Sequence, residues 1–211
     1  MEQIKQLTNA VDSATSDMLP APSVELYVSV EKLLSSRADM YQCWKFRSKH
    51  LIAHCCKRLM IKNRKVLFLT MDMLEYIGYQ TELTFYSQVA TKDFLLRLSG
   101  LLQAKDLNEA VMRNLSKVSN KILSTVKCWE ELFKPHQDLH PMFFQFYDGL
   151  VKKGYDTKKD YVSPYRPKEL KKYPTKAEQQ KKVTSTASTY HSEPKSDKTS
   201  TNSSQSITSL K

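Results

Sequence analysis

The stretch that most constrains the fold runs from Asn63 to Tyr79, and it reads as one helix that is apolar around nearly its whole circumference. Asn63 is a good N-cap residue, and Gly78 is expected to end the helix. Asp72 and Glu75 are its acidic residues, which need only be solvated or paired. A surface helix would carry a single apolar stripe, so this pattern predicts a helix buried among others. Its apolar residues are Val66, Leu67, Phe68, Leu69, Met71, Met73, Leu74 and Ile77.

Amphipathic patterns on both sides of this stretch supply the helices that would surround it. Apolar residues make up 40% of the chain and there are only four glycines, which suits a helical core better than a β-sandwich with many turns. The third pattern has a markedly basic side, formed by Lys45, Arg47, Lys49, Lys57, Arg58 and Lys62. The flanking helices are expected near residues 3–16, 23–34, 41–61, 91–102, 109–133 and 141–153, with a short polar helix or a turn near 82–87.

The helical pattern ends at Gly154, where a glycine follows two lysines and is expected to terminate the last helix. The net charge of the chain is +11, and residues 152–182 hold eleven Lys or Arg against four Asp or Glu. From about Thr175 the sequence is rich in Ser and Thr and has too few apolar residues to offset its ordering entropy. We therefore expect a helical domain over residues 1–155 and a disordered tail over 156–211, first basic and then Ser/Thr-rich.

The residues that could carry catalysis or bind a metal do not form a convincing site. His50, His54, Cys43, Cys55 and Cys56 are zinc-ligand types, but all would come from one helix, so we expect no metal. The four cysteines form no disulfide framework, and no secretory signal or transmembrane run is visible, which favours a reducing cytosol. There is no phosphate-binding glycine loop and no GxSxG motif, so we expect neither an enzyme nor a cofactor.

Five short motifs, in this order and spacing, resemble the VHS domain of endosomal and Golgi sorting proteins over about residues 1–155. The resemblance implies an all-α, right-handed superhelix of about eight helices, of the ENTH/VHS type. It also implies a non-enzymatic adaptor in vesicular or endosomal protein sorting, located in the cytoplasm and peripheral on endosomal or Golgi membrane. The motifs are Val11-Asp-Ser-Ala-Thr-Ser16, Asn63-Arg-Lys-Val66, Val89-Ala-Thr-Lys-Asp-Phe-Leu95, Trp129-Glu-Glu-Leu-Phe133 and Phe146-Tyr-Asp-Gly-Leu-Val-Lys-Lys-Gly154.

The resemblance further implies two protein-binding sites. Some VHS domains bind ubiquitin or ubiquitinated cargo through the second helix, using a Trp and a later aliphatic residue, and those positions hold Val24 and Val28 here. Other members bind acidic sorting-signal peptides between the sixth and eighth helices. The matching residues for that groove are Lys92, Phe94, Leu95, Tyr147, Leu150 and Lys152.

The basic cluster after the last helix suggests an anionic, phosphoinositide-containing membrane as a further partner, because clustered cations are attracted to such surfaces. Nucleic acid is less favoured, since the aromatic residues of the domain lie at core spacing rather than as a stacking platform. The alternative function is a CTD-interacting type of domain that binds phosphorylated RNA polymerase repeats in the nucleus. The membrane-binding candidates are Lys152, Lys153, Lys158, Lys159, Arg166, Lys168, Lys171 and Lys172.

Overall fold

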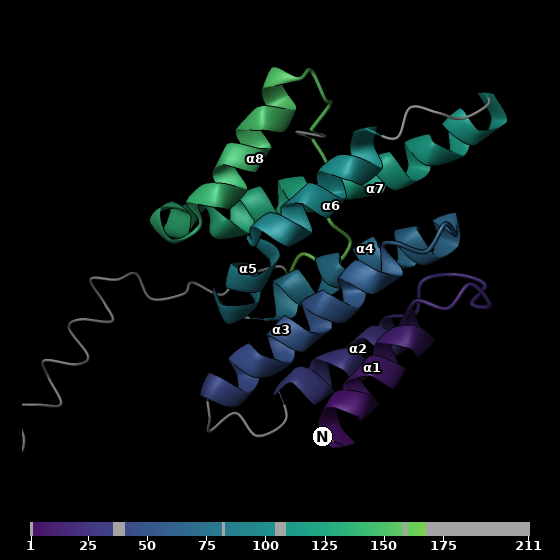
Figure 1. Ribbon diagram of the computed structural model, residues 1–211, viewed down its shortest axis with the longest axis vertical. Coiled ribbons are helices and arrows are strands. Elements are labelled where there is room, and N and C mark those ends of the chain that lie inside the picture. The colour runs from purple at the N-terminus through teal and green to yellow at the C-terminus, as the bar shows by residue number, and fades with distance from the viewer. Residues whose placement is uncertain (1, 36–40, 82, 104–108, 158–159, 168–211) are drawn as a thin grey trace, which may run out of the picture. The chain divides into compact units, whose positions relative to one another are not determined.

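The computed structural model describes residues 2–35, 41–81, 83–103, 109–157 and 160–167 (Figure 1). Over these residues the chain forms eight α-helices, one short 3-10 helix and no strand, so the predicted all-α class with about eight helices is confirmed. In chain order the elements are α1 (Glu2–Ala14), α2 (Val24–Ser35), α3 (Tyr41–Arg58), α4 (Arg64–Gln80), α5 (Leu83–Val89), α6 (Lys92–Gln103), α7 (Glu109–Phe133), η1 (Lys134–Leu139) and α8 (Pro141–Lys152). The predicted Ser/Thr-rich tail lies outside the described residues.

Two of the predicted helix ends are confirmed by the backbone geometry. The side chain of Asn63 accepts hydrogen bonds from the backbone N–H groups of Lys65 and Val66, at 3.0 and 3.4 Å, and so caps α4. Gly154 follows α8 with φ at 77°, a left-handed conformation that residues with a Cβ rarely adopt. Both helix ends thus depend on local chemistry that can be read from the sequence.

The prediction that Gly78 ends the central helix is wrong, because α4 continues to Gln80. A Cβ atom at Gly78 would lie 2.8 Å from the indole nitrogen of Trp129 on α7, which is closer than real Cβ contacts allow. The fully buried Trp129 therefore occupies the space that a side chain at Gly78 would need. This glycine sets how closely α4 and α7 approach each other.

Helix α4 lies at the centre of the packing, as its apolar pattern predicts. Every residue from Leu69 to Tyr79 is buried. The helix contacts α1 and α2 on one side and α7 on the other, and it also packs against α3 (Figure 1). Burial of this many apolar side chains supplies the main free energy of folding, at roughly 25 cal/mol per Å² of apolar area.

Three charged side chains form a buried charge cluster between α4 and α7, defined here as Asp72, Glu75 and Lys121. The Nζ atom of Lys121 lies 2.5 Å from Oδ1 of Asp72 and 2.8 Å from Oε2 of Glu75. The exposed fractions of the Lys121, Asp72 and Glu75 side chains are 7%, 6% and 0%. Thr125 on α7 donates a hydrogen bond of 3.0 Å to Glu75, and Tyr27 on α2 donates one of 3.0 Å to Asp72. Both carboxylates thus have charged and neutral donors.

Residues 160–167, which we name the C-terminal strap, lie against this cluster. The Tyr161 hydroxyl donates a 3.0 Å hydrogen bond to Oε1 of Glu75, and the Tyr165 hydroxyl donates to Asp72. The Tyr165 ring meets the ring of Tyr76 edge-on, with centroids 5.5 Å apart. The structure therefore describes packed residues beyond the predicted boundary at 155. We propose that the folded unit extends to about residue 167, and the two-part division of the chain stays a prediction.

Replacing Lys121 with Met should destabilise the domain by about 3–5 kcal/mol, because both carboxylates would stay buried without a cation. The matched control is Lys127→Met on the same helix. Lys127 pairs with Glu130 and Glu131, and Glu131 is a third exposed, so this substitution leaves carboxylates that solvent can reach and should cost less. Urea unfolding followed by circular dichroism measures both losses. Equal losses in the free energy of unfolding would show that the buried charge cluster contributes no more to stability than the other ion pair of α7.

Ending the chain after Tyr155 should lower the free energy of unfolding by about 2–5 kcal/mol, since two hydrogen bonds to buried carboxylates are lost. A chain ending after Pro167 keeps both bonds and should unfold like the full-length protein. Thermal and urea unfolding of the three lengths decides the matter. If the chain ending at 155 is as stable as the other two, the strap contributes nothing to the fold.

Candidate functional site

The buried charge cluster has the residue types of a catalytic site, but its environment is that of a structural one. Burial lowers the pKa of Lys121, and the carboxylates of Glu75 and Asp72 outweigh that effect, so its pKa is raised overall and the ammonium stays charged. Burial, followed by the effect of Asp72, raises the pKa of Tyr27 and of Tyr165. Burial and Glu75 also raise the pKa of Tyr161, to about 12. These groups keep their protons at neutral pH, so they serve as donors rather than as bases or nucleophiles.

The two predicted ubiquitin-binding residues lie on α2, whose inward face is formed by Tyr27, Val30 and Leu34. Val24, at the first turn, is 47% exposed. Val28, one turn later, is half-buried and packs partly against the core. The pair thus offers one open and one partly open apolar side chain on the same helix face.

The predicted sorting-signal residues divide into two groups. Phe94, Leu95 and Leu150 are buried in the core, with exposed fractions of 5% or less. Lys92 and Lys152 are exposed, and Tyr147 is half-buried against the core. Helices α6 and α8 pack directly on each other, so three of the apolar side chains expected to hold a peptide already have a structural role.

Few of the predicted membrane-binding residues lie in the described part of the chain. Lys152 and Lys153 are exposed at the end of α8. Arg166, in the C-terminal strap, lies 3.2 Å from Glu131 of α7 and so is paired with a carboxylate. The other five candidates lie outside the described residues: Lys158, Lys159, Lys168, Lys171 and Lys172.

The histidines and cysteines of α3 take part in packing and local pairing. His54 lies 2.8 Å from Asp12 of α1, and Cys55 is fully buried. Burial raises the pKa of the Cys55 thiol, and it also raises that of Cys56. Among the residues that the structure describes, no group of three His, Cys, Asp or Glu side chains has a geometry that could hold a metal ion.

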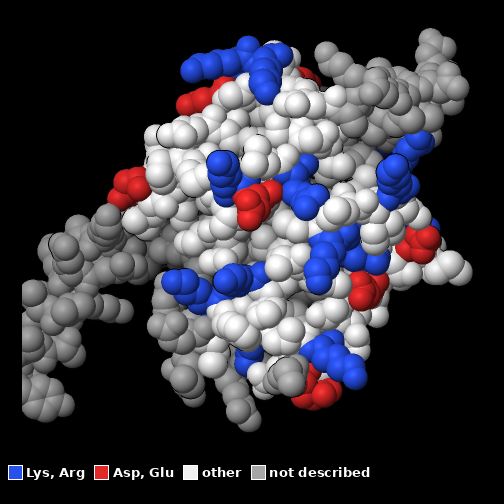
Figure 2. Space-filling model, viewed as in Figure 1, with Lys and Arg blue, Asp and Glu red and all other residues white. Residues whose placement is uncertain are grey.

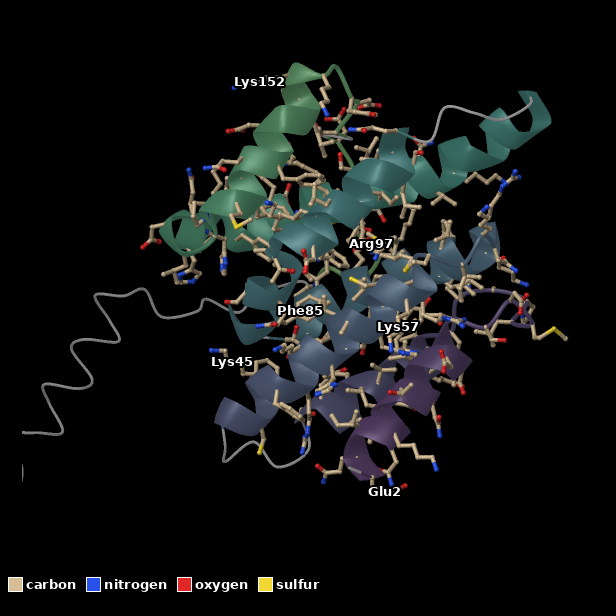
Figure 3. The ribbon with its side chains drawn as sticks, in the orientation of Figure 1. Glu2, Lys45, Lys57, Phe85, Arg97 and Lys152 are labelled. Atoms are coloured by element: carbon tan, nitrogen blue, oxygen red, sulfur yellow. The ribbon has the colours of Figure 1, made fainter. Side chains whose placement is uncertain are left out.

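The basic side of α3 is split between two environments, which sequence reasoning did not anticipate. Arg47 and Arg58 point inward, where Arg47 donates to the Leu33 carbonyl and Arg58 to the Thr15 carbonyl. Lys45, Lys49 and Lys57 remain exposed. In Figure 3, Lys45 and Lys57 extend from α3, and Arg97 extends from α6 toward the same face. Positively charged side chains are spread over this face of the molecule (Figure 2).

A groove of about 820 Å³ lies between α3 and α6, and sequence reasoning missed it. Ile52, Leu59 and Phe94 line it with apolar surface, and Lys49, Lys57 and Arg97 contribute cations. The signal that could have found it is the spacing of the exposed lysines at positions 45, 49 and 57, because multiples of four place them on one side of a helix.

Comparison with known proteins agrees with this architecture. A family model described as the VHS domain matches residues 1–154, which include all eight α-helices and end before the strap. Curated relatives include TOM1-like protein 8 of Arabidopsis thaliana, 28% identical over 157 residues, and TOM1-like protein 6 of the same plant, 27% identical over 147 residues. These alignments cover 74% and 70% of this chain but only 22% and 20% of the relatives, so the chain spans about a fifth of their length. The family match covers well over half of the sequence, and the chain belongs to the VHS domain family.

Proposed function

We propose that this chain is a non-enzymatic adaptor in vesicular protein sorting and that its α2 helix recognises ubiquitin. The observation that supports this best is the 47% exposure of Val24, with Val28 one turn further along the same face. Membership of the VHS family and similarity to TOM1-like proteins support the adaptor role. The groove for acidic sorting-signal peptides is the weaker of the two proposed sites, because Phe94, Leu95 and Leu150 are already buried.

The expected affinity for ubiquitin follows from the size of the exposed side chains. A valine buries far less area than the Trp that the family resemblance places at position 24. Losing a large aromatic contact removes one to a few kcal/mol at roughly 25 cal/mol per Å². We therefore expect a dissociation constant near the millimolar end of the scale, which corresponds to a binding free energy on the order of −4 kcal/mol. Such weak binding suits an adaptor that engages ubiquitinated cargo through several contacts at once.

Replacing Val24 with Asp should abolish ubiquitin binding, because a carboxylate would be desolvated against an apolar surface. Titration of isotope-labelled ubiquitin with the full-length chain, followed by NMR, measures the loss. Ser29→Asp is the matched control. Ser29 is exposed on a different face of the same helix, and its substitution adds the same charge. Absence of shifts with the unmodified chain at millimolar concentration would remove ubiquitin from the proposal and leave the sorting-signal residues Lys92, Tyr147 and Lys152.

We further propose that the basic residues after α8 attach the chain to an anionic, phosphoinositide-containing membrane. Lys152 and Lys153 are exposed side by side at the helix end, where they begin the basic part of the sequence. No helix in the described part of the chain is long and apolar enough to cross a bilayer. Attachment through these lysines is electrostatic, at about 1 kcal/mol for each cation near the surface.

Replacing Lys152 and Lys153 together with Ala should weaken binding to vesicles that contain phosphoinositide by about 30-fold, the equivalent of about 2 kcal/mol. Co-sedimentation at low and high salt measures this, and screening should weaken the unmodified chain as salt rises. The double variant Lys5→Ala/Lys32→Ala removes the same charge from exposed positions on α1 and α2 and is the control. Equal binding to neutral and anionic vesicles would contradict the proposal.

A further inference from the structure

The groove between α3 and α6 continues into a second hollow of about 660 Å³ along α3. The two hollows share Lys49 and Gln88, so they form one surface that follows α3. Lys45 and Phe46 line one end, and Lys57 and Met60 line the other. Residues 45 to 57 span about 18 Å of helix at 1.5 Å per residue, which is the length of a little over three turns.

Four cations line this surface. Lys45, Lys49 and Lys57 lie in a row with four-residue spacing. Ala53 occupies the remaining position of this row, and its small side chain leaves space there. Arg97 faces them from α6 (Figure 3). Among the described residues, none of these four cations forms an ion pair. One carboxylate, Asp93, also lines the groove, so the lining keeps an excess of positive charge.

Large apolar side chains are exposed along the same surface. Phe46 is 54% exposed, Met60 is 60% exposed, and Leu96 on α6 is 59% exposed. Between them the groove is lined by the buried side chains of Ile52 and Phe94. Exposed large apolar residues beside an apolar hollow are typical of a surface that binds a protein segment.

We propose that this groove binds an amphipathic helix of a partner protein, with an acidic face toward the lysine row and Arg97 and an apolar face in the hollow. Charge complementarity selects acidic side chains, and the apolar lining selects leucine-like ones. A helix is the fitting conformation because α3 and α6 keep their backbone groups in their own hydrogen bonds. An extended peptide would leave its N–H and C=O groups unpaired in the apolar part of the groove, at about 1–3 kcal/mol each. A helix satisfies these groups internally and presents acidic residues at a matching four-residue repeat.

Two other occupants fit the groove less well. Residues 168–211 of this chain carry nine lysines and four acidic residues, so they would be repelled by the lysine row. A bilayer surface can neutralise the rim cations, but a broad surface does not enter a hollow lined by Ile52 and Phe94. The groove is also formed by helices other than α2, so this site is independent of the proposed ubiquitin surface.

The test uses the full-length chain and a fluorescent synthetic helix of about 18 residues, long enough to follow α3 at 1.5 Å per residue. The peptide carries four leucines in an i, i+3/i+4, i+7 stripe and glutamates on the neighbouring positions. Fluorescence anisotropy should show saturable binding that weakens as salt rises. Two further peptides define the chemistry: one with glutamine in place of glutamate, and one with two central prolines. Each should bind at least about tenfold more weakly, since one loses the charge and the other the helix.

The site is located with Lys49→Glu/Lys57→Glu, which reverses two exposed rim charges and should weaken binding at least about tenfold. Lys5→Glu/Lys32→Glu makes the same change in net charge at exposed positions outside the groove and should alter binding less than about twofold. Ala53→Arg fills the hollow while adding a cation. It should weaken binding if the apolar face enters the groove. Equal losses in both double variants would overturn the proposal, and so would unchanged binding of the proline peptide. It would also be overturned if the Lys49/Lys57 variant bound the peptide normally and lost binding only to anionic vesicles.

Discussion

Lys121 allows two carboxylates to occupy the centre of an array of apolar helices. Removing an ion from water costs several kcal/mol even after the protein relaxes, and Asp72 and Glu75 meet that cost through one shared ammonium and several hydroxyl donors. The contacts join α2, α4, α7 and the C-terminal strap at one point. Apolar packing alone would hold these elements together, but it would tolerate small changes in their register. Paired charges with fixed donors tolerate far fewer arrangements.

The close contact of α4 with α7 has a second requirement, which is the absence of a side chain at Gly78. Trp129 fills the space beside this residue, and its ring stacks parallel to that of Phe133. Phe133 in turn meets the ring of Phe143 of α8 edge-on, with centroids 4.6 Å apart. A glycine on the central helix thus determines where a chain of aromatic rings lies, and this chain positions the last helix of the domain.

Sequence periodicity predicted the helices and several of their ends, because 3.6-residue spacing and the caps at Asn63 and Gly154 are local properties. It could not predict that Gly78 is a packing residue, since that depends on a tryptophan 51 residues away in the sequence. The strap falls within the predicted tail for a similar reason. Its sequence has two prolines and no helical periodicity, and its attachment depends on two tyrosine hydroxyls that reach carboxylates 86 and 93 residues away. Likewise, the basic side of α3 was visible, but not that Arg47 and Arg58 turn inward while three lysines stay on the surface.

The positions of the cluster residues along the chain have a consequence for synthesis. Lys121 follows Glu75 by 46 residues, so at about 5–20 residues per second the carboxylates leave the ribosome roughly 2–9 s before their cation. Tyr165 comes 44 residues after Lys121, which adds a similar interval. A nascent chain that enclosed α4 early would bury two unpaired negative charges. We therefore expect α1 to α4 to stay loosely associated, with Asp72 and Glu75 in water, until α7 arrives during translation.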